Sequence, residues 1–178
     1  MTPKDGEWLK QLIRIIPDFP MKGISFKDIT TLLKDGEAWR KSIRSLAEAC
    51  KGKGAELVVG PEARGFIIGA PLAYELGIGF VPVRKAGKLP GPTLRGEYKL
   101  EYGKDVLEIH RDAIRPGQKV LVVDDLLATG GTISASVDMV KQLGGNVVAL
   151  AFLIELTDLK GRDKLKDFDV VSLIKYPS

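Results

Sequence analysis

Hydrophobic residues follow two alternating patterns along this chain. Short runs rich in β-branched residues indicate buried strands, whereas apolar residues spaced three and four apart indicate helices that cover a sheet. The runs predict strands over 57–59, 80–83, 120–123, 147–154 and 170–174. The helical spacing predicts helices over 8–16, 39–50, 66–76 and 132–143, with ends before Pro17 and at Gly77 and Gly144.

Strands that alternate with helices are typical of an α/β fold with a parallel sheet covered on both faces. Ligands of such sheets bind at the carboxyl ends of the strands. The loops after Val59, Val83 and Val123 should therefore share one functional edge. Residues 86–110 break the pattern, because they are rich in glycine and proline and contain two short β-like runs, 98–100 and 106–109. We expect a protruding flexible loop or a hairpin there.

The stretch 120–132 carries the clearest chemical signal. A buried strand leads into two carboxylates, Asp124 and Asp125, and then into small and hydroxyl residues that precede a helix: Ala128, Thr129, Gly130, Gly131 and Thr132. Glycines permit close backbone approach, and free N–H groups at a helix start attract phosphate. Two acids repel phosphate unless the ligand also carries hydroxyls or a divalent cation. A ribose 5-phosphate meets both demands.

Other interpretations of this stretch are weaker. An ordinary strand-to-helix turn with an acidic flank would use similar residues. The chain contains no G-x-x-x-x-G-K-[ST] loop and no G-x-G-x-x-G fingerprint, so neither a Walker-type nucleotide site nor a dinucleotide site is indicated.

The run VVDDLLATGGT at 122–132 resembles the phosphoribosyl pyrophosphate signature of the type I phosphoribosyltransferases. Other blocks are similar to those of the adenine-specific members: IPDFP at 16–20, FKDIT at 26–30, GPEARGF at 60–66, RKAGKLP at 84–90 and LEYG at 100–103. The resemblance implies a single phosphoribosyltransferase domain over 1–178, with a small N-terminal hood at about 1–35 and a flexible catalytic loop at about 86–110. It also implies that a homodimer converts adenine and phosphoribosyl pyrophosphate to AMP and pyrophosphate, in purine salvage.

Composition limits the partners and the compartment. The chain has 178 residues, a formal net charge of +4 and one cysteine, Cys50. Basic residues are interleaved with acids, so nucleic acid is not an expected partner. A lone cysteine fits a reducing compartment, and no signal-peptide pattern opens the chain. The longest apolar run, 147–154, is too short to span a bilayer. We therefore expect a cytoplasmic protein without a membrane partner.

The candidate ribose ligands are Asp124 and Asp125, at what we expect to be an exposed strand end. Successive strand residues point to opposite faces, so both acids reach one sugar only if the backbone bends. Otherwise one acid serves the ribose and the other orients a cation or a basic side chain. We place both acids among the catalytic candidates, and we expect the backbone of 128–132 to hold the 5-phosphate, with the Thr129 and Thr132 hydroxyls assisting.

The candidate pyrophosphate ligands come from two other strand ends. Arg64 follows Glu62 and Ala63, and a guanidinium can bind phosphate bidentately. The second group, at the next strand end, is basic and consists of Arg84, Lys85 and Lys88. The resemblance implies that the loop at 62–64 can hold a cis peptide, and that the basic group can act across a dimer interface. The alternative for both groups is a set of solvated charges, which the neighbouring phosphoribosyl motif makes weaker for Arg64.

Mg²⁺ is the expected cofactor, because pyrophosphate carries a large negative charge. Mg²⁺ keeps its waters and binds substrate oxygens rather than a dedicated protein cage, so no direct protein ligand is assigned. The lone histidine, His110, excludes a His-based metal site, and we expect it to be structural.

Glu101 is the candidate acid–base group, because the attacking purine nitrogen must lose a proton and a carboxylate can arrive with loop closure. The resemblance assigns purine proton handling to Glu101 and loop gating to Tyr102. A surface glutamate on a hairpin is the alternative. Phe26 could stack on adenine or belong to the core, and the backbone groups of Ser25 and Lys27 could bind the purine edge.

Two rival functions remain from the sequence. The first is transfer to another purine such as hypoxanthine, guanine or xanthine. The second is a regulatory protein that senses phosphoribosyl pyrophosphate and binds nucleic acid, against which the mild charge argues.

Overall fold

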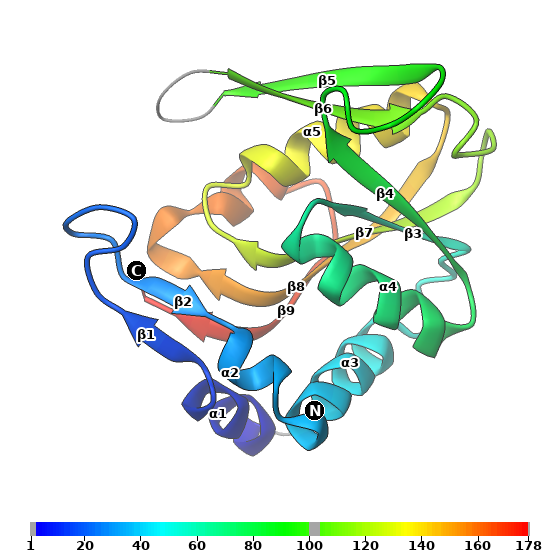
Figure 1. The fold of residues 1–178 in the computed structure, drawn as a ribbon. Coiled ribbons are helices and arrows are strands. Elements are labelled where there is room, and N and C mark those ends of the chain that lie inside the picture. Colours follow the sequence, from blue (N-terminus) through cyan, green and yellow to red (C-terminus); the bar gives the residue numbers. More distant parts are fainter. Residues whose placement is uncertain (1–2, 100–103, 178) are drawn as a thin grey trace.

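A seven-stranded sheet organises the computed structural model, which describes residues 3–99 and 104–177 (Figure 1). The strand order is β5-β6-β4-β3-β7-β8-β9. The parallel part contains β3 (Leu57–Pro61), β4 (Gly79–Lys85), β7 (Lys119–Leu127), β8 (Asn146–Leu156) and β9 (Val170–Tyr176). These strands include all five runs predicted from the hydrophobic pattern, so the α/β prediction is confirmed.

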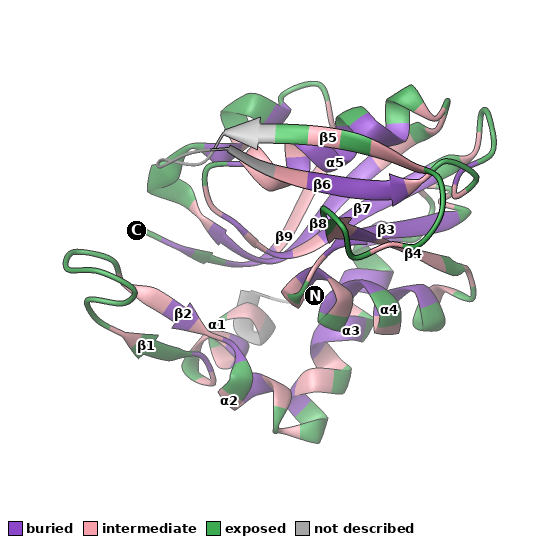
Figure 2. Cartoon of the chain, turned by 45° about the horizontal axis from the view of Figure 1, so that its top comes forward, coloured by how far each residue is buried: buried purple, intermediate pink, exposed green. Residues whose placement is uncertain are grey.

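Helices cover both faces of this sheet. On one face lie α3 (Gly36–Cys50) and α4 (Arg64–Leu76), and on the other lies α5 (Gly131–Gln142). The Asp35 carboxylate caps α3 by accepting from the backbone N–H groups of Glu37 and Ala38, at 3.1 and 3.0 Å. Gly77 ends α4 with a φ of 69°. Figure 2 shows the resulting core, with buried residues along the strands and on the inner sides of the helices. Within the described ranges, no helix has the length and apolar character needed to cross a bilayer.

The sheet is mixed rather than wholly parallel. A hairpin of β5 (Thr93–Lys99) and β6 (Lys104–His110) adds antiparallel strands beside β4. The described residues 86–92, which link β4 to β5, contain no helix and are too few for the crossover connection that a parallel neighbour needs. Leu107 and Ile109 are buried, and a Cβ atom at Gly96 would lie only 2.9 Å from Met139 Cγ of α5. Of the two expectations for 86–110 the hairpin is confirmed, and part of it belongs to the core.

The N-terminal segment differs from the predicted long helix. It contains α1 (Pro3–Gln11), β1 (Arg14–Ile16), β2 (Phe26–Asp28) and α2 (Thr30–Leu33). The helix predicted to reach Ile16 is therefore wrong in its second half. Ile15 and Ile16 instead pair with Lys27 and Phe26 in an antiparallel ribbon, where β-branched side chains are favoured.

Packing joins this N-terminal segment to the sheet. Leu9 of α1 and Leu32 of α2 are fully buried in the same hydrophobic cluster as α3, α4 and the central strands. The Tyr176 hydroxyl of β9 also donates to the Lys10 carbonyl oxygen at 3.0 Å. Two short 3-10 helices not expected from the sequence, η1 (Thr157–Leu159) and η2 (Gly161–Leu165), connect β8 to β9.

The central position of β7 leads to a stability prediction. Leu121 of β7 is fully buried, so Leu121→Ala should lower the free energy of unfolding by about 2–5 kcal/mol through lost burial and a cavity. The matched control Leu159→Ala, at a side chain that is 42% exposed, should cost less than about 1 kcal/mol. Chemical denaturation of both variants measures the difference, and equal losses would contradict the assigned core.

Candidate active site

The carboxyl ends of three neighbouring strands bring the candidate residues to one edge. β3 pairs in parallel with both β4 and β7, with Pro61 opposite Val83 and Val59 opposite Val122. The segments that follow therefore meet at this edge: 62–64 after β3, 84–88 at the end of β4, and 124–132 at the end of β7. Two helices, α4 and α5, also begin there, and their positive dipole ends favour an anionic ligand.

A phosphate-sized hollow lies between β7 and α5. It has a volume of about 80 Å³ and is lined by Asp124 and residues 126–133. Gly130 precedes α5 with a φ of 79°, a conformation that glycine adopts without strain. The structure thus brings together all five predicted loop residues and one of the two acids, around the backbone of a helix start. We name residues 128–132 the phosphate loop.

The two acids occupy different environments. Asp124 lines the hollow, and its Oδ1 accepts from the Asp125 N–H at 2.8 Å. Asp125 is 3% exposed, and its Oδ2 lies 3.2 Å from the Arg64 Nε. Among the described residues, that buried oxygen accepts no hydrogen bond of good geometry.

The expected exposed strand end was wrong, because β7 continues to Leu127 and Asp125 is buried. The arrangement supports the second of the two alternatives for the acids. Asp125 lies beside a basic side chain, and Asp124 lies at the hollow.

Burial makes both carboxylates costly to ionise. It raises the pKa of Asp124 well above its usual range, and the nearby charge of Asp125 raises it further. Burial also raises the pKa of Asp125, while the Arg64 guanidinium opposes that rise. Hydroxyl groups of a ligand would offset this cost by donating hydrogen bonds to the ionised acids.

Arg64 connects these acids to the N-terminal segment. It is the first residue of α4, and its Cζ lies 5.4 Å from the centroid of the Phe26 ring. Phe26 remains partly exposed rather than entering the core, and it packs edge-on against Phe19 with the centroids 5.1 Å apart. Arg64 therefore contacts both the predicted base-stacking ring and Asp125.

A glycine that sequence reasoning missed permits this approach. A Cβ atom at Gly65 would lie 2.9 Å from Pro61 Cδ and 3.1 Å from Asp124 Oδ1. Any side chain there would push the start of α4 away from the acid. The only available signal was its place within the GPEARGF block.

The Lys27 side chain is held inside the N-terminal segment. Its Nζ donates to the Ser25 carbonyl oxygen at 3.1 Å and to the Ser25 Oγ at 2.8 Å, and it lies 5.2 Å from the Tyr176 ring centroid. Burial lowers the pKa of Lys27. These contacts occupy the ammonium group of the Lys27 side chain.

Glu62 is already paired with Arg84. The Arg84 Nε donates to Glu62 Oε2 at 2.7 Å, and its Nη1 donates to the Lys88 carbonyl oxygen at 3.2 Å. The peptide bond between Glu62 and Ala63 is cis. The side chains of Lys85 and Lys88 are exposed. The structure therefore joins Arg84 to the 62–64 loop and leaves both lysines at the surface.

A buried carboxylate not expected from the sequence supports the turn after β4. Glu108 is 2% exposed and accepts from the Arg95 Nε at 2.9 Å and from the Gly87 N–H at 3.0 Å. The signal was an acid inside the apolar run 106–109.

Glu101 and Tyr102 lie outside the described residues. The His110 Nε2 lies 2.8 Å from the Pro90 carbonyl oxygen, which can only accept, so this nitrogen donates. That contact joins β6 to the segment before β5, as a structural residue would.

Comparisons with known proteins agree on one family. Residues 30–177 match the family model described as phosphoribosyl transferase domain. The adenine phosphoribosyltransferase of Clostridium perfringens (strain SM101 / Type A) is 66% identical over 168 residues, covering 94% of this chain and 98% of that protein. The one from Clostridium tetani is 59% identical over the same shares.

Solved structures give the same result. The crystal structure of adenine phosphoribosyltransferase from Thermoanaerobacter pseudethanolicus superposes with a TM-score of 0.94 at 61% identity, covering 96% of this chain and 99% of that one. The Saccharomyces cerevisiae enzyme, complexed with an imino-altritol bisphosphate and adenine, has a TM-score of 0.91 at 41% identity, covering 97% and 99%.

The fold and the phosphate loop thus define a phosphoribosyltransferase. The chain belongs to this family and, within it, to the adenine phosphoribosyltransferases.

The raised pKa of Asp124 leads to a prediction about stability. An acid whose pKa is higher in the folded chain than in the unfolded chain stabilises the folded state at pH values below its unfolded pKa of 3.8. This stabilisation is lost as the pH rises through the pKa of the folded state. At pH 7, Asp124→Asn should therefore raise the melting temperature by about 2–4 °C, the shift that 1 kcal/mol produces at this size.

Thermal unfolding between pH 4 and 8 tests this prediction, and the gain should shrink toward acid. Asp167→Asn, at an exposed acid, is the control and should leave the melting temperature unchanged. A lower melting temperature for Asp124→Asn at pH 7 would show that the ionised carboxylate stabilises the fold.

Proposed function

We propose that the chain transfers the 5-phosphoribosyl group from phosphoribosyl pyrophosphate to adenine, giving AMP and pyrophosphate in purine salvage. The observation that carries this proposal is the phosphate loop at a helix start with Asp124 beside it. A phosphate loop alone would suit many anions. The neighbouring carboxylate restricts the ligand to one that presents hydroxyls or a cation next to its phosphate.

The sugar phosphate would bind between the phosphate loop and the acids. Backbone N–H groups of 128–132 would hold the 5-phosphate, with the hydroxyls of Thr129 and Thr132 assisting. Asp124 would accept from the ribose hydroxyls, which the lining of the hollow supports. Asp125 would orient Arg64, which their 3.2 Å contact supports. Both acids would also stabilise positive charge that develops on the sugar during transfer.

The pyrophosphate would leave along the 62–64 loop. Arg64 would bind it bidentately, with backbone groups of Glu62 and Ala63 alongside. Glu62 would orient Arg84 toward the same group, which their hydrogen bond supports. The exposed Lys85 and Lys88 would add positive charge.

Adenine would stack on Phe26. The partly exposed ring lies close to Arg64, which supports a base position between the hood and the sugar. Backbone groups of Ser25 and Lys27 would bind the purine edge, because the Lys27 side chain is held by Ser25 and Tyr176.

Mg²⁺ would travel with the pyrophosphate. The donor set fits a hard cation held mainly by substrate oxygens, since, among the described residues, a single carboxylate, Asp124, borders the hollow. When bound, the ion would neutralise negative charge on the leaving pyrophosphate. The chain's own residues bind and orient the sugar and the base.

The protein would act as a homodimer of single-domain chains in the cytoplasm. Helix α4 presents Ile67 and Tyr74 to the surface, 40% and 87% exposed, which supports burial of this face against a second copy.

The lone cysteine, Cys50, is a buried free thiol, which supports a reducing compartment.

A purine screen tests the proposed activity. With phosphoribosyl pyrophosphate and Mg²⁺, adenine should have a specificity constant at least about a hundredfold above those of hypoxanthine and guanine. A pocket whose polar groups hydrogen-bond the edge of adenine leaves those groups unpaired when a 6-oxopurine binds, which lowers its specificity constant. A higher specificity constant for a 6-oxopurine would contradict the assignment. Salt-dependent binding of nucleic acid, without turnover, would instead favour the regulatory alternative.

The proposed acid–base role of Glu101 is tested by replacing its carboxylate with an amide. Glu101→Gln should lower the single-turnover rate by roughly two to four orders of magnitude, because the amide cannot exchange a proton at neutral pH. Substrate saturation should change little. Glu97→Gln, at a glutamate of β5 close to Glu101 in the sequence, is the matched control and should keep its rate. A fall of less than about fivefold in Glu101→Gln would assign Glu101 to the loop surface.

A further inference from the structure

Gly130 of the phosphate loop packs backbone to backbone against Gly161, which lies behind the loop. A Cβ atom at Gly161, the first residue of η2, would lie 2.1 Å from the Ala128 carbonyl oxygen. A Cβ atom at Gly130 would lie 3.0 Å from the Gly161 carbonyl oxygen. No side chain fits at Gly161 without a shift in either the loop or η2. The position of η2 therefore sets the position of the loop backbone.

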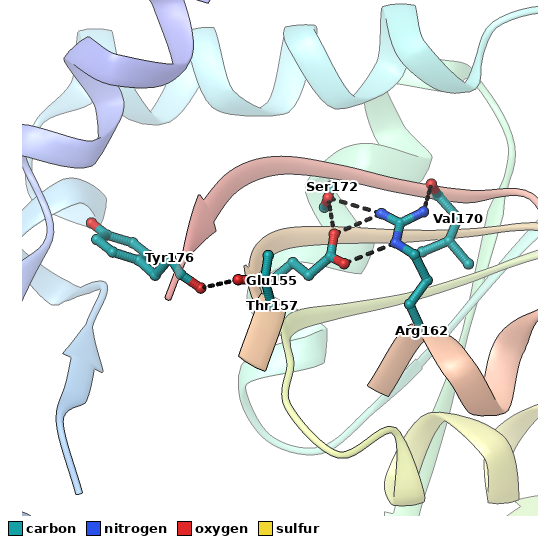
Figure 3. A network of polar contacts seen from close by, with 6 residues as sticks. All are labelled: Glu155, Thr157, Arg162, Val170, Ser172 and Tyr176. Carbon is teal, nitrogen blue, oxygen red and sulfur yellow. Dashed lines mark hydrogen bonds and ion pairs between the residues drawn. The ribbon is translucent and has the colours of Figure 1, made fainter. Parts of the chain in front are cut away.

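The residue after Gly161 is anchored by a network of polar contacts (Figure 3). The Arg162 Nε and Nη2 donate to the two carboxylate oxygens of Glu155 at 2.8 and 2.6 Å. Arg162 also donates to the Val170 carbonyl oxygen at 2.9 Å and to the Ser172 Oγ at 3.2 Å. The Ser172 hydroxyl in turn donates to Glu155. This two-point pairing fixes the guanidinium in direction as well as distance.

Glu155 is itself fixed next to the phosphate loop. In the pairing of β7 with β8 it lies opposite Leu127, the residue before Ala128. The contacts therefore close on themselves. The phosphate loop packs on Gly161, and the next residue, Arg162, binds Glu155. Glu155 in turn pairs with Leu127, which leads into the loop.

The Glu155–Arg162 pair is stronger than an ordinary surface ion pair. The Glu155 side chain is only 7% exposed, and the hydrogen bonds from Arg162 lower its pKa. Loss of Arg162 would leave a buried carboxylate without its main partner, which is far more costly than loss of an exposed pair. Leu165, buried at the other end of η2, would still hold that end in the core. The displacement should therefore concentrate at Gly161.

We propose that Arg162 and Glu155 are positioning residues, which hold Gly161 against the phosphate loop and thereby set the backbone geometry that binds the 5-phosphate. This inference rests on the proposed function, because it assigns the loop to the phosphate of phosphoribosyl pyrophosphate and AMP. It predicts an effect on phosphate affinity that exceeds any effect on the base.

The test compares two loop-backing variants with a distant arginine. Arg162→Ala removes the anchor, and Gly161→Ala introduces the Cβ atom that conflicts with Ala128. Arg44→Ala is the matched control, because Arg44 makes a surface ion pair with Glu75 at 3.6 Å on helices away from the loop. AMP binding by calorimetry and the KM values for both substrates are measured on folded protein, with thermal unfolding recorded in parallel.

Both loop-backing variants should raise the AMP Kd and the KM for phosphoribosyl pyrophosphate roughly tenfold, as expected for a displaced binding group. The KM for adenine should stay within about twofold, and Arg44→Ala should match the wild type. Arg162→Lys should lie between wild type and alanine, because an ammonium reaches Glu155 without the two-point fork.

The possible failures are distinguishable. If wild-type protein neither binds AMP nor converts adenine, the proposed function fails and this inference fails with it. If the wild type does both, and folded Gly161→Ala and Arg162→Lys show wild-type AMP affinity, the inference alone is overturned. The same holds if the melting temperature falls while the AMP Kd stays constant, which is the result for a purely structural anchor. Should Arg162→Ala not fold, Gly161→Ala and Arg162→Lys decide the outcome.

Discussion

The parallel pairing of β3 with β7 is the constraint on which the site depends. It brings two strand ends that are far apart in the sequence to the same edge, so that the first turns of α4 and α5 lie close together. Two opposite effects act on an anion at this edge, since two helix starts attract it while the partly buried Asp124 and the buried Asp125 repel it. Arg64 lies at the start of α4 and beside Asp125, so its positive charge offsets the negative charge of the acids.

The features that the sequence predicted well are those encoded locally. Each parallel strand is a short apolar run, and the sheet buries such runs on both faces, so their existence follows from hydrophobicity alone. The phosphate loop was also predictable, because Gly130 must take a positive φ between a strand and a helix. The place of the two acids near the end of β7 followed from the same local pattern. The burial of Asp125 did not, since it depends on how far β7 continues and on what covers it.

The features that the sequence did not predict depend on contacts between distant residues. Nothing near Gly161 indicates that its backbone meets Ala128, because that contact arises only once η2 folds over the end of β7. The Glu62–Arg84 pair likewise needs two strands in register. The error in the first helix has a different cause. An isoleucine pair suits helix and strand alike, and its pairing with Phe26 and Lys27 decided the outcome.

The hydrogen bond from Tyr176 to the Lys10 carbonyl joins residues 166 positions apart, which matters while the chain is being synthesised. At a translation rate of about 5–20 residues per second, Lys10 is added to the chain roughly 10–30 s before Tyr176. Helix α1 and its apolar face, including Leu9, must wait for that time without the strand that covers them. During synthesis the apolar face of α1 therefore lacks its contacts with β9 until the last strand is made, although in the finished protein it is part of the core.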